Sequence, residues 1–423
     1  MAAAVIASQV SHGPPGQPDI SYTPDLEKYT NRSKRRAETE KLGHELPAGF
    51  PKKLNSDLVW DRDSLAGNYD WNYVLTADDI AEIRSALQHF KSLGKPISFV
   101  SQESFPLPNL HAMLRDVSRE LHQGHGFKVV RGVPVTEHTL EDNIIIYAGI
   151  SSHVAPLRGR QDVQYQGKPA DVVLAHIKDL TGKVDAASIG APAYTTEKQV
   201  FHTDAGDVIA LFALAESAHG GESYLSSSYC VYNELAERRP DLIRTLAEPW
   251  AFDEFGKSAR KFSLRPLLHQ VPISTALDSN ENNVSSHVNE KPRLVIQYAR
   301  RSFTGYWGLP RSSDIPPITE AQAEALDALH FTAERNAVAL NFHQGDIQYV
   351  NNLSIFHTRG AFTDSPEKHR HLVRLWLRDP EYAWPTPEAL KDRWDHLYTG
   401  VTPEKSVFPL EPTVRSASKG RAT

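Results

Sequence analysis

The chain has 423 residues, of which 40% are hydrophobic and 23% charged, and its formal net charge at pH 7 is −6. This is the composition of an ordinary globular protein, and the slight acidic excess argues against a nucleic-acid partner or an anionic membrane surface. The single cysteine, Cys230, excludes an intramolecular disulfide and a cysteine-built zinc cluster, and no apolar run is long enough to span a membrane. We therefore expect a cytoplasmic protein; the sequence carries no indication of its oligomeric state.

The N-terminal region, residues 1–45, is polar, contains several prolines and glycines, and includes a basic run at residues 31–36. We interpret it as a disordered tail, because runs of like charge are usually solvated. A helix is predicted over residues 76–93, since Thr76 can cap it and apolar residues recur at helical spacing. A second helix is predicted over residues 319–335, which open with the capping-box pattern Thr-Glu-Ala-Gln.

Most of the remaining chain consists of short β-branched and aromatic runs separated by Gly, Pro and Asp, which is typical of strands and turns. The sequence therefore predicts a mainly β fold with flanking helices, in the form of a sandwich or barrel. Residues 46–398 are predicted to form one domain with a flexible polar insertion at 275–292, followed by a C-terminal tail at 399–423. The predicted strands are 126–132, 172–176, 199–204, 208–213, 221–226, 293–298, 346–350 and 371–377.

A histidine and an aspartate stand two residues apart in the sequence Val-Phe-His202-Thr-Asp204. If residues 199–204 form a strand, both side chains point to one face, because alternate residues of a strand share a face. An imidazole beside a carboxylate provides two ligands of a 2-His-1-carboxylate iron site, which leaves positions open for a co-substrate and O2. About two His-x-acid patterns are expected by chance in such a chain, so this pattern alone fits a surface pair equally well.

The third ligand and an anion-binding group are predicted further along the chain. His357 follows a Gly-Asp turn at residues 345–346 and the predicted strand at 346–350. Arg370 and Arg374 come after it and share one face of the next predicted strand. The planar guanidinium of arginine suits a carboxylate, as a dicarboxylate co-substrate requires. Taken singly, His357 could equally be a packed structural histidine, and the arginines could be cross-strand ion-pairing residues.

Taken together, these residues resemble the pattern of the taurine dioxygenase-like (TauD/TfdA) family of Fe(II)- and 2-oxoglutarate-dependent oxygenases, and its fungal branch in particular. The resemblance covers roughly residues 95–398, with His202, Asp204, His357 and Arg370 in the order of the family pattern. Ser223, after a Gly-Gly turn, stands where the family has a hydroxyl residue. Serine there instead of threonine, and Val-Asn-Asn-Leu at 350–353 instead of Trp-Asp-Asn-Arg, argue against taurine itself as the substrate.

The resemblance implies a double-stranded β-helix, a jelly-roll of two facing sheets with helices outside the larger one. It implies Fe(II) bound by His202, Asp204 and His357, and 2-oxoglutarate bound by Arg370 and Ser223, with Arg374 as a second anchor. It further implies that O2 and 2-oxoglutarate are consumed, succinate and CO2 are released, and a small organic substrate is oxidised, by default through hydroxylation. The pathway would be specialised metabolism or nutrient scavenging.

Several alternatives stay open in the sequence. His176 is a candidate for the substrate pocket, and Arg374 is another, because it can contact an anionic substrate instead of 2-oxoglutarate. Residues 149–163 and 181–198 are candidate lid segments. Two other functions suit the same fold: a catalytically inactive binding module, and a zinc hydrolase with the same three ligands. The zinc hydrolase has no use for Arg370 or Ser223.

Overall fold

The larger of two facing β-sheets forms the centre of the molecule, in a computed structural model that describes residues 13–255, 259–272 and 292–416. Its strands hydrogen-bond in the order β1-β2-β17-β7-β20-β3, and β6 also pairs with β20. All of these pairings are antiparallel except β1 with β2. The strands are β1 (Asn72–Val74), β2 (Phe127–Arg131), β3 (Leu157–Arg158), β6 (Leu174–Lys178), β7 (Val208–Ala215), β17 (Ile347–Asn351) and β20 (His371–Arg378).

A smaller antiparallel sheet, in the order β16-β9-β18, faces the larger one. It consists of β16 (Val338–Leu340), β9 (Ser223–Ser227) and β18 (Ile355–Arg359). One buried apolar cluster joins the two sheets, with Phe127 and Val350 from the larger sheet against Leu225 and Ile355 from the smaller one. Two facing sheets closed on an apolar interior form a jelly-roll, and the fold is the double-stranded β-helix expected from the resemblance.

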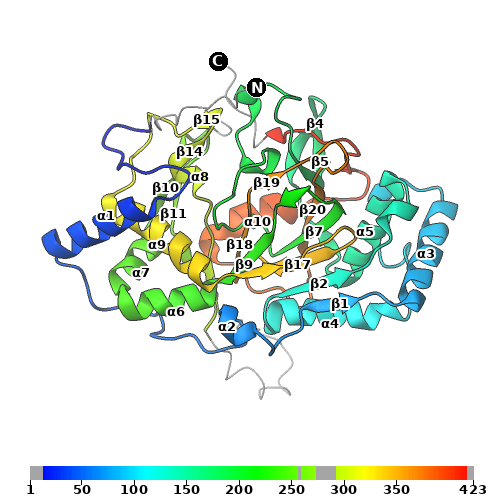
Figure 1. Ribbon diagram of the computed structural model, residues 1–423, viewed down its shortest axis with the longest axis horizontal. Helices are drawn as coiled ribbons and strands as arrows, with labels where there is room; N and C mark the ends of the chain where they lie inside the picture. The colour runs from blue at the N-terminus through cyan, green and yellow to red at the C-terminus, as the bar shows by residue number, and fades with distance from the viewer. Residues whose placement is uncertain (1–12, 256–258, 273–291, 417–423) are drawn as a thin grey trace.

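Helices flank the sheets on both sides (Figure 1). The helices α3 (Ala77–Ser92), α4 (Leu110–Gln123) and α5 (Leu140–Val154) share one core with β2, β7, β17 and β20. The helices α6 (Ser228–Arg238), α7 (Pro240–Ala247) and α9 (Glu320–Asn336) share another core with β12, β13 and Phe356 of β18. The predicted cap at Thr76 and the predicted capping box at Thr319 are both confirmed, at the starts of α3 and α9.

The remaining elements are short and lie at the edges of these layers. They are α2 (Arg62–Leu65), α8 (Arg301–Thr304), α10 (Lys391–Tyr398), β4 (Asp162–Tyr165), β5 (Lys168–Val172), β8 (His219–Gly220), β10 (Trp250–Asp253), β11 (Phe262–Arg265), β12 (Leu268–Gln270), β13 (Leu294–Ile296), β14 (Gly305–Tyr306), β15 (Leu309–Pro310), β19 (Phe362–Thr363) and β21 (Ser406–Val407). Among the described residues, every helix is too short or too polar to act as a membrane span.

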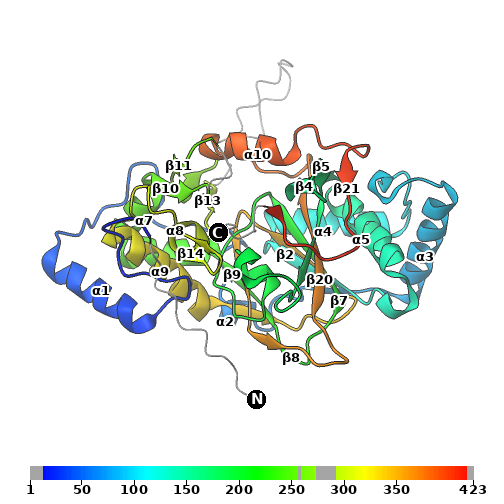
Figure 2. The same cartoon turned by 90° about the horizontal axis from the view of Figure 1, so that it is seen from above.

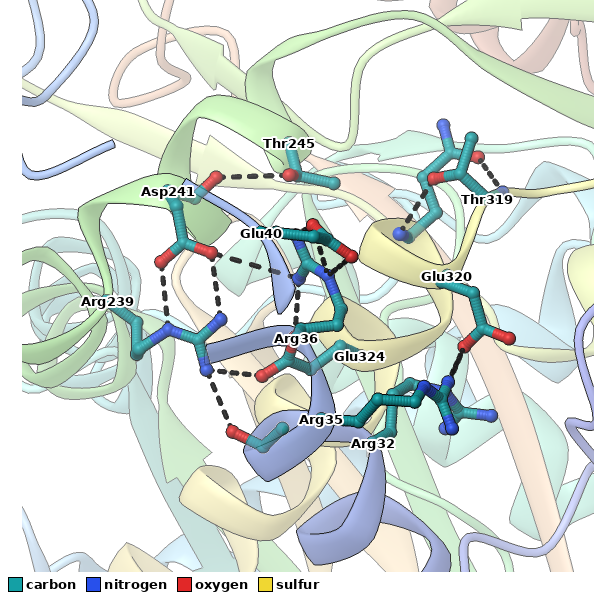
Figure 3. Close-up of polar contacts among 12 residues, drawn as sticks. Arg32, Arg35, Arg36, Glu40, Arg239, Asp241, Thr245, Thr319, Glu320 and Glu324 are labelled. Carbon is teal, nitrogen blue, oxygen red and sulfur yellow. Dashed lines mark hydrogen bonds and ion pairs between the residues drawn. The ribbon is translucent and has the colours of Figure 1, made fainter. Parts of the chain in front are cut away.

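The region expected to be a disordered tail contains a docked helix instead, α1 (Leu26–Thr39), within the described residues 13–45. Two of its basic residues are not solvated, because Arg32 and Arg36 are each 5% exposed and face α9. Arg32 pairs with Asp327 at 2.7 Å, and Arg36 pairs with the fully buried Glu324. Figure 3 shows Arg36 and Arg239 converging on Glu324, with Asp241 holding Arg239. We call Arg32, Arg36, Arg239, Asp241, Glu324 and Asp327 the α1–α9 ion cluster.

The C-terminal segment also differs from the expected tail, because residues 399–416 pack against the body of the protein. β21 pairs in parallel with β5 (Figure 2), and the side chain and backbone N–H of Ser416 both bind the Asp162 carboxylate. The insertion expected at 275–292 lies outside the described residues apart from Pro292. The strand expected at 199–204 is not formed; a single bridge joins His202 to His357 there.

Candidate active site

His202, Asp204 and His357 lie together in a pocket lined by residues of both sheets. The backbones of His202 and His357 exchange two N–H···O bonds of 3.1 Å, which set their rings side by side at 4.3 Å between centroids. The Asp204 carboxylate lies 3.8 Å from Nε2 of His202. One potential ligand atom from each residue lies within 4.8 Å of the other two. Two imidazoles and one carboxylate at this separation could hold one divalent transition metal.

The protonation states of these three residues suit a metal. The pKa of His357 is lowered to about 3, mainly by burial and in smaller part by the neighbouring His202. Burial likewise lowers the pKa of His202. Burial raises the pKa of Asp204, but Arg374 and the two histidines outweigh it and hold that pKa below the usual range. Two neutral imidazoles and an ionised carboxylate are the forms that bind metals.

Polar side chains fix the Asp204 carboxylate and its loop. Arg374 Nη1 and Trp376 Nε1 both donate to Asp204 Oδ2, at 2.5 and 3.2 Å. Asn352 accepts from the backbone N–H of Asp204 and donates to its carbonyl oxygen, at 2.8 and 2.9 Å. Gln161 Oε1 accepts from Arg374 Nε at 2.8 Å. The contacts place Arg374 beside a candidate metal ligand, and Gln161 behind it.

Arg370 lines the same pocket as the three candidate ligands and is 6% exposed. Its guanidinium lies over the Phe362 ring, 5.4 Å from the centroid, and no carboxylate of a described residue pairs with it. Burial lowers the pKa of Arg370 to about 9, and the nearby Arg359 adds to this. An unpaired buried cation is costly. Arg370 is therefore suited to bind an anion that enters the pocket.

Ser223 begins β9, lines the pocket and is 6% exposed. Its hydroxyl donates to Gln348 Oε1 at 2.7 Å. The pocket thus brings together His202, Asp204, Ser223, His357, Arg370 and Arg374, all six residues predicted as metal or co-substrate ligands.

His176 lies outside this pocket, contrary to the expectation that it is a substrate-pocket residue. Its Nδ1 faces His371 Nε2 at 2.7 Å, and its Nε2 lies 2.8 Å from the carbonyl oxygen of Pro409. The next residue of β6, Ile177, lines the pocket instead. Neighbouring residues of a strand point to opposite faces, so His176 is directed away, under the C-terminal segment.

Family and structural comparisons agree with this geometry. The sequence profile described as "Taurine catabolism dioxygenase TauD, TfdA family" matches residues 71–376. The chain belongs to the TauD, TfdA family. It is therefore a non-haem Fe(II)- and 2-oxoglutarate-dependent oxygenase that uses O2, as the sequence resemblance implies.

Two proteins with similar sequences come from a fungus and a bacterium. The "Taurine hydroxylase-like protein SAT17" of Stachybotrys chartarum is 33% identical over 368 residues, which cover 85% of this chain and 89% of that protein. The "FR-33289 synthase" of Streptomyces rubellomurinus is 26% identical over 333 residues, covering 77% and 90% of the two chains. A crystal structure of asparagine oxygenase with Fe(II), 2S,3S-3-hydroxyasparagine and succinate matches with a TM-score of 0.52 at 14% identity, covering 73% and 94%. At that identity the last match bears on the fold alone.

Several pocket residues of this family member escaped the sequence analysis. Tyr22, from the segment before α1, and Arg415, from the C-terminal segment, both line the pocket, although neither lies in the stretch that matches the family profile. Arg301 at the start of α8 also lines it. Of the two candidate lid segments, 181–198 contributes residues 191–193 to the pocket wall, and 149–163 contributes Gln161 behind Arg374. None of these residues carries a local motif, so sequence spacing alone offers no signal for them.

Proposed function

We propose that His202, Asp204 and His357 bind Fe(II), that Arg370 and Ser223 bind the distal carboxylate of 2-oxoglutarate, and that the enzyme hydroxylates a small organic substrate. The observation that carries this proposal is the position of Arg370. A buried guanidinium without a carboxylate partner among the described residues opens onto the pocket that holds the three candidate ligands. A dicarboxylate that reaches both the metal and Arg370 satisfies both groups at once.

The candidate ligands fit an iron ion chemically. Nδ1 of His357 is buried and has no hydrogen-bond partner among the described residues. Nδ1 of His202 lies 2.8 Å from the carbonyl oxygen of Val200, which fixes that ring and leaves Nε2 toward Asp204. A hydrogen bond to the far nitrogen is the usual means of orienting a ligating histidine. Bound iron and 2-oxoglutarate would supply O2 activation, which side chains cannot provide.

The side chains have separate tasks in this proposal. The contacts of Arg374 and Trp376 with Oδ2 of Asp204 support a role in orienting that carboxylate, with Oδ1 left toward His202. Arg370 would anchor the distal carboxylate of the co-substrate, since a guanidinium suits a carboxylate. The Ser223 hydroxyl, which donates to Gln348 Oε1, would add a further donor to the same carboxylate.

The domain that carries this function is proposed to be larger than residues 46–398. Helix α1 is buried against α9, and residues 399–416 supply a pocket residue, so both segments belong to the catalytic unit. The name of the 33% identical relative, a taurine hydroxylase-like protein, supports hydroxylation of a small acid. We propose that the reaction occurs in the cytoplasm, where a reducing environment keeps the metal ferrous.

Anaerobic absorbance spectroscopy tests the proposal. Fe(II) followed by 2-oxoglutarate is added to the purified protein, and the visible charge-transfer band of the chelate is titrated. We expect a band in the wild type, none in His202→Ala, and a requirement for at least about 30-fold more 2-oxoglutarate in Arg370→Ala. Arg119→Ala, which removes an arginine with a 54% exposed side chain, should match the wild type. A wild type that binds Zn(II) but shows no such band with Fe(II) would support the hydrolase instead.

A further inference from the structure

The pocket contains more arginines than the binding of 2-oxoglutarate requires. Six arginines line it, whereas Asp204 is the one carboxylate among the described residues of its wall. The arginines are Arg300, Arg301, Arg359, Arg370, Arg374 and Arg415. Iron(II) and the dianion of 2-oxoglutarate together add no net charge, so binding them does not remove this excess.

Four of the six arginines have a carboxylate partner, several backbone carbonyl partners, or the co-substrate. Arg300 pairs with Asp327 at 2.7 Å, and Arg374 pairs with Asp204. Arg359 donates to the backbone carbonyl oxygens of Thr195, at 2.9 Å, and Glu197. Arg370 binds 2-oxoglutarate in the function proposed above. Arg301 and Arg415 remain.

Arg301 and Arg415 lack a carboxylate partner among the residues that the structure describes. Arg301 Nη1 donates to the carbonyl oxygen of Gly190 at 2.5 Å. Arg415 has only long contacts, from Nε to the Tyr194 hydroxyl at 3.3 Å and from Nη1 to the Gln161 carbonyl oxygen at 3.4 Å. Both guanidiniums therefore keep N–H donors available to a ligand.

The two guanidiniums are close enough to repel each other. The pKa of Arg301 is lowered to about 10, mainly by burial and in smaller part by the charge of Arg415. The other pocket residue from a terminal segment, Tyr22, brings no opposing charge, because burial raises its pKa to about 12 and the hydroxyl stays neutral. Burial lowers the pKa of Arg415, but Tyr194 and the carboxylates of Asp204 and Asp162 outweigh it and raise that pKa. Both guanidiniums therefore stay charged in one pocket, and neither forms an ion pair with a carboxylate of a described residue. An anion bound between them can pair with both.

We propose that Arg301 and Arg415 form a second anion-binding subsite, distinct from the 2-oxoglutarate anchor, which binds the acidic group of the primary substrate. This inference rests on the proposed function and specifies its substrate as a small organic oxyacid. Carboxylate, sulfonate and phosphonate groups share the required chemistry, since each offers at least two oxygens to the planar guanidinium. The acidic group is held at the pocket wall, and the rest of the substrate extends toward the candidate iron ligands.

The C-terminal segment has the structure needed to present Arg415. β21 pairs with β5, Val414 packs on the apolar cluster of Leu180 and Ile189, and Ser416 binds Asp162. Arg415 is thus held between two attachments. Its guanidinium also lies over the Trp376 ring, 5.5 Å from the centroid. A cation fixed in this way loses little conformational freedom when it binds an anion.

The test uses holoenzyme saturated with Fe(II) and 2-oxoglutarate under anaerobic conditions, so that Arg370 is already occupied. Acetate, inorganic sulfate and inorganic phosphate are titrated separately at constant ionic strength with chloride, and binding is followed by calorimetry and by changes in the charge-transfer band. We expect at least one oxyanion to bind, and its affinity to fall at least tenfold in Arg301→Leu and in Arg415→Leu. Arg415→Lys should retain part of the affinity, because it keeps the charge and loses the planar fork.

The controls separate this inference from the proposed function. Arg119→Leu should bind the oxyanion like the wild type, and the 2-oxoglutarate titration should be unchanged in Arg301→Leu and Arg415→Leu, which also shows that they are folded. Equal oxyanion affinity in the wild type and both leucine variants, or no binding of any of the three probes, overturns the second subsite while the band stands. Absence of the band in the wild type overturns the proposed function instead. Among the probes, preference for acetate indicates a carboxylate substrate, and preference for a tetrahedral anion indicates a sulfonate or phosphonate.

Discussion

Two groups of buried arginines in this protein differ in what surrounds them. In the α1–α9 ion cluster, every arginine meets a carboxylate: Arg32 meets Asp327, and Arg36 and Arg239 share Glu324 (Figure 3). In the pocket, Arg370 meets an aromatic ring, and Arg301 meets a backbone carbonyl oxygen. The first group is complete within the chain, whereas in our proposal bound anions complete the second. Burial alone therefore does not distinguish a structural arginine from a ligand-binding one; its partner does.

The largest loss of stability is expected from Glu324→Gln, which removes one negative charge from the α1–α9 ion cluster. Glu324 is fully buried and neutralises two arginines. Removing one partner from a buried ion pair leaves an uncompensated charge, so we expect the free energy of unfolding to fall by about 3 kcal/mol. Urea denaturation measures it. The matched control is Glu320→Gln, whose side chain is 45% exposed and which should cost less than about 1 kcal/mol. A loss no larger than that of the control contradicts a structural role for the cluster.

A smaller loss in the free energy of unfolding is expected when the pH is lowered, because of His330, a buried histidine on α9. Burial lowers the pKa of His330 to about 3, with Arg300 and Lys198 adding to this, while Glu334 lies 3.9 Å away. Below about pH 6.5 the unfolded chain binds a proton that the folded chain does not, so stability falls as the pH falls. At pH 5 this amounts to about 2 kcal/mol relative to pH 7.

Denaturation at both pH values in the wild type and in His330→Gln isolates this contribution, since the variant lacks it. His343→Gln is the control, because the His343 side chain is 50% exposed. It should lose as much stability between pH 7 and pH 5 as the wild type. If His330→Gln also does so, His330 does not account for the loss.

The smallest change in the free energy of unfolding is expected from Arg370→Met, measured in the protein without metal or co-substrate. Because Arg370 has no carboxylate partner among the described residues, its removal relieves a desolvated charge and keeps the apolar contact with Phe362. We expect the free energy of unfolding to be unchanged or to rise by up to about 1 kcal/mol. Arg36→Met, from the complete group, should lower it by about 3 kcal/mol. Similar losses in the two variants would remove the distinction between the groups.

The sequence was informative where a local signal matched the final structure. The capping boxes at Thr76 and Thr319 lie within the segments they organise, so α3 and α9 could be predicted with the right start. Helix α1 could not, because its buried face is made of arginines rather than apolar residues. The acidic residues that pair with Arg32 and Arg36, Asp327 and Glu324, lie 295 and 288 residues further along the chain.

The candidate site could be predicted only in part, because contacts between distant segments complete it. His202 and Asp204 are presented together as expected, but a bridge to His357 achieves this in place of a regular strand. His176 was assigned to the wrong face, because the phase of β6 depends on its pairing with β20. Arg301 and Arg415 lie in segments without periodicity, and only the fold brings them to one pocket.

The parallel pairing of β21 with β5 has an evolutionary consequence. It attaches a terminal segment to the rim of the barrel, so that Arg415 reaches the pocket from a part of the chain that carries no predicted metal ligand. Because none of the candidate metal ligands lies in this segment, a substitution at Arg415 changes the pocket wall and leaves those ligands in place. Within a lineage of such enzymes, substrate preference is then open to change around an inherited reactive centre.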